Sequence, residues 1–121
     1  MRVERLGWLG LRTERFTETI EFFERTLGAR VVRREEHRVM FELGNGDPVD
    51  VWDAGAPENP HFGAAPVVGF AVHDVHAARR DLERAGIELI GPVQRGFGFA
   101  WAHFRGPDGN LYELQEREPT A

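Results

Sequence analysis

The chain contains no cysteine, no long run of apolar residues and no cluster of basic residues. Without cysteine it forms no disulfides and has neither thiolate metal ligands nor a cysteine nucleophile. No apolar stretch approaches the roughly 18 to 20 residues that a membrane-spanning helix needs. The N-terminal segment also lacks the apolar region of a signal peptide, so we expect a cytoplasmic protein without a membrane partner.

Size and charge narrow the class of protein further. At 121 residues the chain has the length of one domain, and 15 basic against 20 acidic residues give a formal net charge of -5. A chain of this size buries a hydrophobic core. Because phosphate binding needs clustered Lys and Arg, nucleic acid is not an expected partner.

The segment from Trp101 to Gln115 predicts a β-hairpin whose register follows from its own residues. Residues 106–110 (GPDGN) are typical of a turn, so we expect His103 opposite Glu113 and Trp101 opposite Gln115. This register collects apolar residues on one face and leaves these four side chains on the other. Directly opposite residues have Cβ atoms about 4.5–5.5 Å apart, which is close enough for a His–carboxylate hydrogen bond.

The first half of the chain predicts a strand, a helix and three further strands. The expected strands cover 2–13, 29–35, 38–43 and 49–53, and the helix covers 17–27. Thr17 is the expected helix cap, and Gly28 lies where glycine commonly follows a helix. Residues 54–66 are rich in Ala, Pro and Gly and predict a linker.

The same order of elements returns after the linker. The expected elements are a strand over 66–72, a helix capped by Asp74 and closed by Gly86, a strand over 87–90 and the hairpin. Residues 96–99 (GFGF) predict a flexible flap. Gly10-Leu11 and Glu24-Arg25 recur at a constant offset as Gly69-Phe70 and Glu83-Arg84. We therefore expect two βαβββ modules, residues 1–53 and 67–116, in a single domain over 1–121.

Strand parity predicts which side chains face away from the helices. The helix-facing side carries Val39, Phe41, Leu43, Val49 and Val51. The concave side carries Arg38, Met40, Glu42, Asp50 and Trp52, together with Trp8, Arg12, Trp101, His103, Glu113 and Gln115. All three tryptophans fall on this side, where indoles offer stacking surfaces and attract cations. Glu42 is an expected neighbour of Asp50, and two facing carboxylates repel unless a cation or solvent separates them.

The repeated module and the segment FRGPDGNLYEL, residues 104–114, resemble the vicinal oxygen chelate superfamily over almost the whole chain. Its members include glyoxalases, bleomycin-resistance and fosfomycin-resistance proteins, and extradiol dioxygenases. The resemblance implies an α+β fold in which two βαβββ modules form a curved eight-stranded mixed sheet with a concave cup. It also implies a homodimer.

The same resemblance implies where a metal would bind. Metal-dependent members take ligands from the first and last strands of each module, at positions that correspond here to Trp8, Asp50, Val67 and Glu113. Asp50 and Glu113 carry carboxylates, whereas Trp8 and Val67 carry no ligand atom. We therefore expect a degenerate or absent metal centre, with a divalent metal as the alternative.

Two functions remain open for the concave face. One is a binding protein of the bleomycin-resistance type that holds a small aromatic or cationic molecule without chemistry. Its expected ligand-binding residues are Trp8, Arg12, Arg38, Asp50, Trp52, Trp101, His103, Glu113 and Gln115. The other is a metal-dependent glyoxalase-like lyase or isomerase, or a dioxygenase-related enzyme, with Glu113 as base or ligand beside His103. Structural roles are open too, as an ion pair for Glu113 with His103 and as packing for the tryptophans.

The open edges of the modules predict a dimer in solution. Either module alone leaves a one-sided sheet whose edges invite pairing. Pairing of modules within one chain or between two chains would cover these edges. Sedimentation at micromolar concentration should therefore show a homodimer, and a monomer at that concentration would contradict the prediction.

Overall fold

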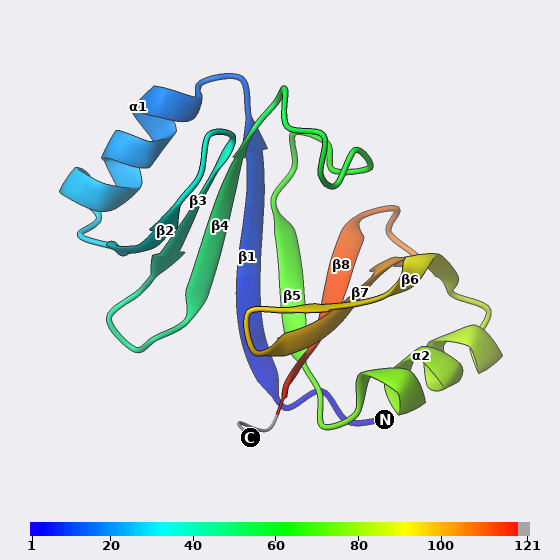
Figure 1. Ribbon diagram of the computed structural model, residues 1–121. Helices are drawn as coiled ribbons and strands as arrows, with labels where there is room; N and C mark the ends of the chain where they lie inside the picture. Colours follow the sequence, from blue (N-terminus) through cyan, green and yellow to red (C-terminus); the bar gives the residue numbers. More distant parts are fainter. Residues whose placement is uncertain (119–121) are drawn as a thin grey trace. The chain divides into compact units, whose positions relative to one another are not determined.

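The computed structural model describes residues 1–118, and its elements follow the order strand, helix, three strands twice over (Figure 1). The elements are β1 (Arg5–Thr13), α1 (Phe16–Glu21), the π-helical segment η1 (Phe22–Thr26), β2 (Arg30–Arg34), β3 (Arg38–Glu42), β4 (Pro48–Asp53), β5 (Val67–Ala71), α2 (Val75–Arg84), β6 (Glu88–Gly96), β7 (Phe99–Arg105) and β8 (Leu111–Arg117). The double βαβββ order predicted from the sequence is confirmed. None of the described helices is both long and apolar enough to cross a membrane.

The strands form one eight-stranded mixed sheet in the order β2-β3-β4-β1-β5-β8-β7-β6. β1 pairs with β4 and β5 pairs with β8 in parallel, whereas the β2–β3, β3–β4, β6–β7 and β7–β8 pairs are antiparallel. The expected α+β class is confirmed. Two compact units divide the chain, an N-terminal unit of Leu9–Pro66 and a C-terminal unit that joins Met1–Trp8 to the chain from Val67 onward.

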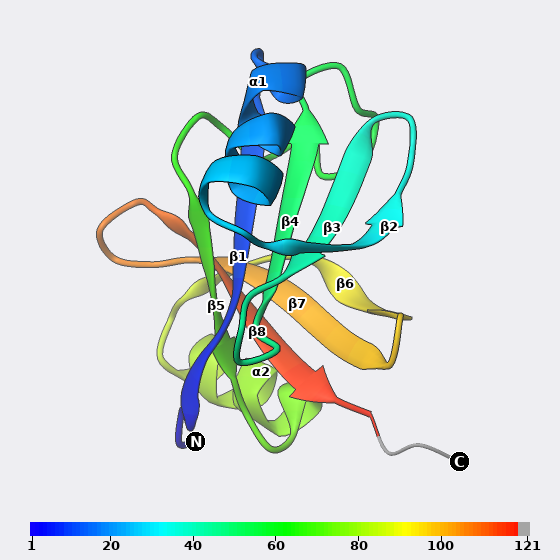
Figure 2. The same ribbon diagram turned by 90° about the vertical axis from the view of Figure 1, so that its left-hand side faces the viewer.

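In the N-terminal unit, α1 covers one face of the strands (Figure 2). The buried core beneath it consists of Ile20, Ala29, Val39, Phe41, Val49 and Val51. The ring of Phe23 stacks on that of Phe41, with centroids 5.7 Å apart. The predicted parity of β3 and β4 is therefore confirmed. Leu43 is the exception, because it lies beyond the end of β3 and is 40% exposed.

The first helix begins earlier than predicted, and Thr17 lies inside it rather than at its cap. Arg15 occupies the N-cap position without a side-chain capping bond, and Thr13 Oγ1 accepts a hydrogen bond of 2.9 Å from the Arg15 N–H. Phe16 packs against the core cluster, so tertiary packing draws this residue into the helix. At the other end Gly28 has a φ of 72°, as predicted for a helix-ending glycine.

In the C-terminal unit, Val75 and Ala78 of α2 share one buried core with Val72, Ala100, Ala102, Phe104 and Leu114. Asp74 caps the helix as predicted, because its Oδ1 accepts a hydrogen bond of 3.0 Å from the Ala77 N–H. That hydrogen bond lowers the pKa of Asp74. Gly86, with a φ of 77°, ends the helix as predicted.

Residues 96–99 form a tight hairpin turn instead of the predicted flap. β6 runs to Gly96, which pairs with Phe99 at the start of β7. Phe97 and Gly98 between them have φ values of 55° and 82°. Two consecutive left-handed residues are what a two-residue hairpin turn requires. The strand expected over 87–90 therefore continues to this turn.

Leu114 tests the core of the C-terminal unit, because it is 1% exposed beneath α2. Leu114→Ala should lower the free energy of unfolding by about 2–5 kcal/mol, since it deletes buried methyl groups and leaves a cavity. Urea unfolding measures the loss. Leu6→Ala, at a position 64% exposed, is the control and should stay within about 0.5 kcal/mol of the wild type. Equal effects of the two changes would contradict this description of the core.

Candidate functional site

The β7–β8 hairpin has the register predicted from the sequence. His103 lies opposite Glu113, and Trp101 lies opposite Gln115. Ala102, Phe104 and Leu114 belong to the core under α2. Side chains alternate along a strand, so the side chains of Trp101, His103, Glu113 and Gln115 project from the face of the sheet opposite to this core.

The turn that joins β7 to β8 is held by its own polar groups. The Gly106 N–H donates to the Asn110 carbonyl at 2.9 Å, and the Tyr112 hydroxyl donates to Asp108 Oδ2. The Tyr112 hydroxyl, and then the Asn110 N–H, lower the pKa of Asp108 by bonding to its carboxylate. The same Tyr112–Asp108 bond raises the pKa of Tyr112. These bonds help to keep the hairpin in its register.

His103 and Glu113 form a buried hydrogen-bonded pair. His103 Nε2 lies 3.1 Å from Glu113 Oε1, and the two side chains are 2% and 5% exposed. Removing a carboxylate from water is costly unless it is paired and hydrogen-bonded. The hydrogen bond between His103 and Glu113 therefore lowers the cost of burying an acid and a base on this face of the sheet.

Gly69 of β5 lies beside Glu113 on the other side from His103. It is the parallel-strand partner of Glu113. A Cβ atom at Gly69 would lie only 2.8 Å from Trp8 Cβ and 3.2 Å from Glu113 Oε2. His103, Glu113, Gly69 and Trp8 thus form one row, the acid–base row. The role of Gly69 was not predicted from the sequence, although a glycine inside a strand often marks a place where another group approaches the backbone closely.

A second row lies next to the first and contains Trp101, Gln115, Ala71 and Gly7. Ala71 pairs with Gln115, and Gln115 Oε1 lies 2.9 Å from where a Cβ atom of Gly7 would be. We call this set the amide row. Gln115 is 6% exposed, whereas Trp101 is only partly buried. Within the amide row, the indole of Trp101 is therefore more accessible to solvent than the carboxamide of Gln115.

Arg12 of the N-terminal unit, a predicted ligand-binding residue, holds the segment that was predicted as a linker. Its guanidinium donates to the carbonyls of Ala54 at 2.6 Å, Ala56 at 2.9 Å, Glu58 at 3.0 Å and Asn59 at 3.4 Å. Backbone carbonyls left without donors would be costly, so one guanidinium orders this irregular stretch. Contact of Arg12 with a ligand stays a prediction.

Asp50, also in the N-terminal unit, does not face Glu42 as the sequence register suggested. Asp50 lies opposite Met40, and Glu42 lies opposite Pro48. The two carboxylates are therefore not directly opposed across β3 and β4. Glu42 instead forms an ion pair with Arg30.

Trp52 and Arg38 lie opposite each other on β4 and β3. The Arg38 guanidinium carbon is 5.7 Å from the indole centroid, within the range of a cation–π interaction. The Phe62 ring meets the same indole edge-on, with centroids 5.6 Å apart. Trp52 is 3% exposed and packs against the segment over 54–66, one of the two roles open from the sequence.

The donor set does not fit a resident divalent metal. Within residues 1–118, no three side chains of His, Asp or Glu gather closely enough to hold a metal ion. Val67 is buried and apolar, and Trp8 places an indole in the acid–base row. His103 and Glu113 alone provide two donors, whereas metal sites of proteins commonly use three or four.

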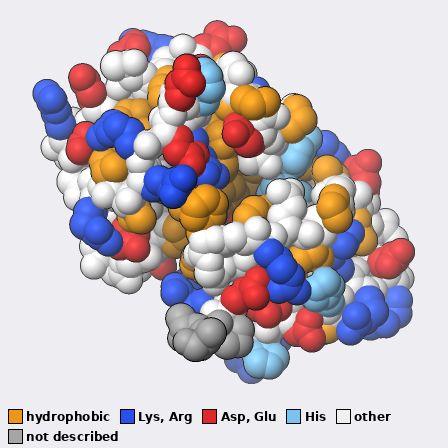
Figure 3. Space-filling model, in the orientation of Figure 1, with side chains coloured by type: hydrophobic (Ala, Val, Ile, Leu, Met, Phe, Trp, Pro, Cys, Tyr) orange, Lys and Arg blue, Asp and Glu red, His pale blue; other side chains and the backbone are white. Residues whose placement is uncertain are grey.

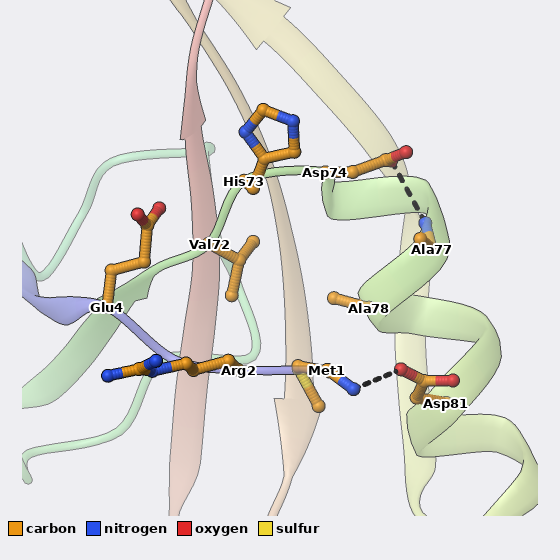
Figure 4. A pocket seen from close by; sticks show the side chains of 9 residues that line it. All are labelled: Met1, Arg2, Glu4, Val72, His73, Asp74, Ala77, Ala78 and Asp81. Carbon is orange, nitrogen blue, oxygen red and sulfur yellow. Dashed lines mark hydrogen bonds and ion pairs between the residues drawn. The ribbon is translucent and has the colours of Figure 1, made fainter.

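Two cavities of the C-terminal unit escaped the sequence predictions. One, of about 430 Å³, lies between the start of the chain and α2, where the amino group of Met1 pairs with Asp81 Oδ2 at 2.8 Å (Figure 4). The other, of about 310 Å³, lies at the end of the sheet and is lined in part by Gln115 of the amide row. Acidic and basic side chains are interspersed on the face seen in Figure 3. No sequence motif predicts either of the two cavities, because residues from the ends of different strands and helices line them.

Comparisons with known proteins agree with the resemblance seen in the sequence. A family model described as "Glyoxalase/Bleomycin resistance protein/Dioxygenase superfamily" matches residues 5–114. No curated protein matches the chain.

Solved structures share the fold at low identity. The Mn(II)-bound glyoxalase from Novosphingobium aromaticivorans is 19% identical with a TM-score of 0.76, over 99% of this chain and 42% of that chain. Methylmalonyl-CoA epimerase from Mycobacterium tuberculosis is 20% identical with a TM-score of 0.74, over 97% and 90%. A superfamily member from Vibrio splendidus 12B01 is 19% identical with a TM-score of 0.68, over 93% and 97%.

The donor set leads to a prediction about metal content. Protein purified without chelators should carry well under one equivalent of Mn, Fe, Ni or Zn, because two neighbouring donors hold such ions weakly. Elemental analysis by mass spectrometry after gel filtration measures the content. Stoichiometric metal that is lost in Glu113→Gln would overturn the prediction.

Proposed function

The chain belongs to the glyoxalase/bleomycin resistance protein/dioxygenase superfamily, and from this premise we propose that it binds a small aromatic cation beside the His103–Glu113 pair. In this proposal the carboxylate of Glu113 attracts the positive charge, and the indoles of Trp8 and Trp101 contact the aromatic part. A cytoplasmic homodimer is part of the same proposal.

The buried acid–base pair is the observation that carries the proposal. A buried ion pair is weak evidence for stability, because well-packed apolar residues often serve the fold equally well. His103 and Glu113 are nevertheless kept on the sheet face that does not pack on α2. Ionisable groups held in such settings are found preferentially at functional sites.

The neighbouring aromatic residues support a cationic ligand. Trp8 and Glu113 Oε2 both approach the same point above Gly69, so an indole and a carboxylate lie side by side. Indole faces attract organic cations, and the attraction grows when water is excluded. A carboxylate next to an indole thus favours a charged, flat ligand over a neutral one.

Access to the pair requires side chains to move, because His103 and Glu113 are buried. Trp101 is the aromatic residue of the two rows that is partly exposed, and its indole lies 3.5 Å from where a Cβ atom of Gly96 would be. Rotation of an indole at a glycine is sterically easy. We infer that ligands enter past Trp101.

A second candidate function is metal-free acid–base catalysis of the lyase or isomerase kind. The observation in its favour is the 3.1 Å hydrogen bond between His103 and Glu113, in which one group orients the other for proton transfer. Ligand turnover separates the two candidates. A binding protein releases its ligand unchanged.

The proposed function predicts charge selectivity that depends on Glu113. 1-Methylquinolinium should bind more tightly than its neutral analogue 1-methylquinolin-2-one and quench tryptophan fluorescence. Glu113→Gln should weaken binding of the cation by about 1.5–3 kcal/mol, the range for a hydrogen bond to a charged group. Fluorescence titration and calorimetry measure both affinities.

Glu83→Gln on the exposed face of α2 is the matched control and should leave both affinities unchanged. A purely structural pair makes a different prediction, in which Glu113→Gln lowers the free energy of unfolding and leaves the cation preference as it was. That result, or equal affinity of the wild type for the two compounds, would refute the proposed function.

A further inference from the structure

Gln115 brings a carboxamide to a cavity at the end of the sheet. The residue is 6% exposed, and it lines this cavity of about 310 Å³. A carboxamide provides two N–H donors and an acceptor oxygen. A hydrogen bond from the amide N–H to a charged ligand group therefore contributes binding free energy.

Gly7 sets the position of this carboxamide. Gln115 Oε1 lies 2.9 Å from where a Cβ atom of Gly7 would be, so the side chain reaches across Ala71 to the neighbouring strand β1. Any larger residue at position 7 would push the amide away. The side chain is therefore held extended, and it lines the cavity of about 310 Å³ at the end of the sheet.

The charged residues around the cavity favour an anion. Arg5 and Arg117 line it, together with Glu4 and Glu116. Glu116 Oε1 accepts a hydrogen bond of 2.8 Å from the Val75 N–H, the first residue of α2. The positive end of the helix dipole offsets part of that negative charge. This interaction with α2 weakens the repulsion that Glu116 exerts on an anion beside Arg117.

Arg117 is already arranged for a flat, negatively charged group. Its guanidinium carbon lies 5.0 Å from the ring centroid of Phe99, which also lines the cavity. A guanidinium stacked on a ring keeps its N–H edges directed outward, where they bind carboxylates in pairs. The ring edge of Phe99 adds apolar surface for an aromatic ligand.

We propose that this cavity is a second ligand site, which binds a small aromatic carboxylate. The carboxylate pairs with the guanidinium of Arg117 and accepts a hydrogen bond from the Gln115 amide, while the ring contacts Phe99. A cavity of about 310 Å³ is at the lower end of the range for small-molecule sites and suits a single ring. The proposal is independent of ligand binding at Glu113.

Benzoate, benzamide and benzamidinium test the proposal, because they share one shape and differ in charge. The chain has only two glutamines, Gln94 and Gln115, so their side-chain NH₂ signals are easily assigned in a ¹⁵N-correlated NMR spectrum. Benzoate should shift the Gln115 signal in a saturable way and leave that of the exposed Gln94 in place. Benzamide should bind more weakly than benzoate, and benzamidinium most weakly.

Variants separate the contact from its positioning. Gln115→Leu should lower the affinity for benzoate about tenfold, as the loss of one hydrogen bond to a charged group requires, while Gln94→Leu changes nothing. Gly7→Ala should also weaken benzoate, because the added methyl group displaces the end of the Gln115 side chain. Gly63→Ala is the control, since a Cβ atom there meets nothing within 4 Å.

Three results would overturn this second site. They are tighter binding of benzamidinium than of benzoate, an unmoved Gln115 signal at saturating benzoate, and unchanged benzoate affinity in Gln115→Leu. Titration of the same samples with 1-methylquinolinium reports on the Glu113 proposal separately. Loss of one binding activity with retention of the other therefore identifies which proposal fails.

Discussion

The alternation of side chains along β8 is the constraint on which the C-terminal unit depends. Leu114 is buried under α2, so its neighbours Glu113 and Gln115 must project from the other face of the sheet. A shift of one residue would drive a carboxylate into the apolar core and expel the leucine. Packing on one face thus fixes the chemistry on the other, because the same register brings His103 to Glu113.

Two glycines make room for the polar side chains on this face of the sheet. Gly69 leaves room for Glu113 and Trp8, and Gly7 leaves room for the end of Gln115. Glycine inside a strand loses more conformational freedom on folding than any other residue. The chain accepts that cost at the two points where a polar side chain reaches over a neighbouring strand. Because Gly69 and Gly7 have no side chains, Glu113 and Gln115 can extend their side chains over the neighbouring strands.

The two rows differ in chemistry although they are built on the same strands. The acid–base row combines a carboxylate, an imidazole and an indole, which favour a cation. The amide row opens into a cavity with two guanidinium groups and suits an anion. Relatives of similar fold include a Mn(II)-bound glyoxalase, at 19% identity. A shared fold accommodates different donor sets, because function is decided by the side chains on it.

The sequence by itself determined the two βαβββ modules, the closing glycines of the helices, the Asp74 cap and the β7–β8 register. These features depend on local signals, namely turn residues, capping groups and the period of apolar residues. For that reason the sequence alone predicted that His103 and Glu113 lie opposite each other on β7 and β8. Turn chemistry was misjudged only where Phe97 adopts a left-handed conformation that its side chain does not announce.

Tertiary structure alone decided the features that depend on residues distant in the sequence. Packing of Phe16 moved the start of α1, Arg12 ordered a segment more than 40 residues away, and the pairing of β3 with β4 set Asp50 opposite Met40. The approach of Gly7 to Gln115 and of Gly69 to Trp8 belongs to the same class. Strand neighbours, burial and cavities arise only when the sheet assembles, since no local propensity encodes which strand lies beside which.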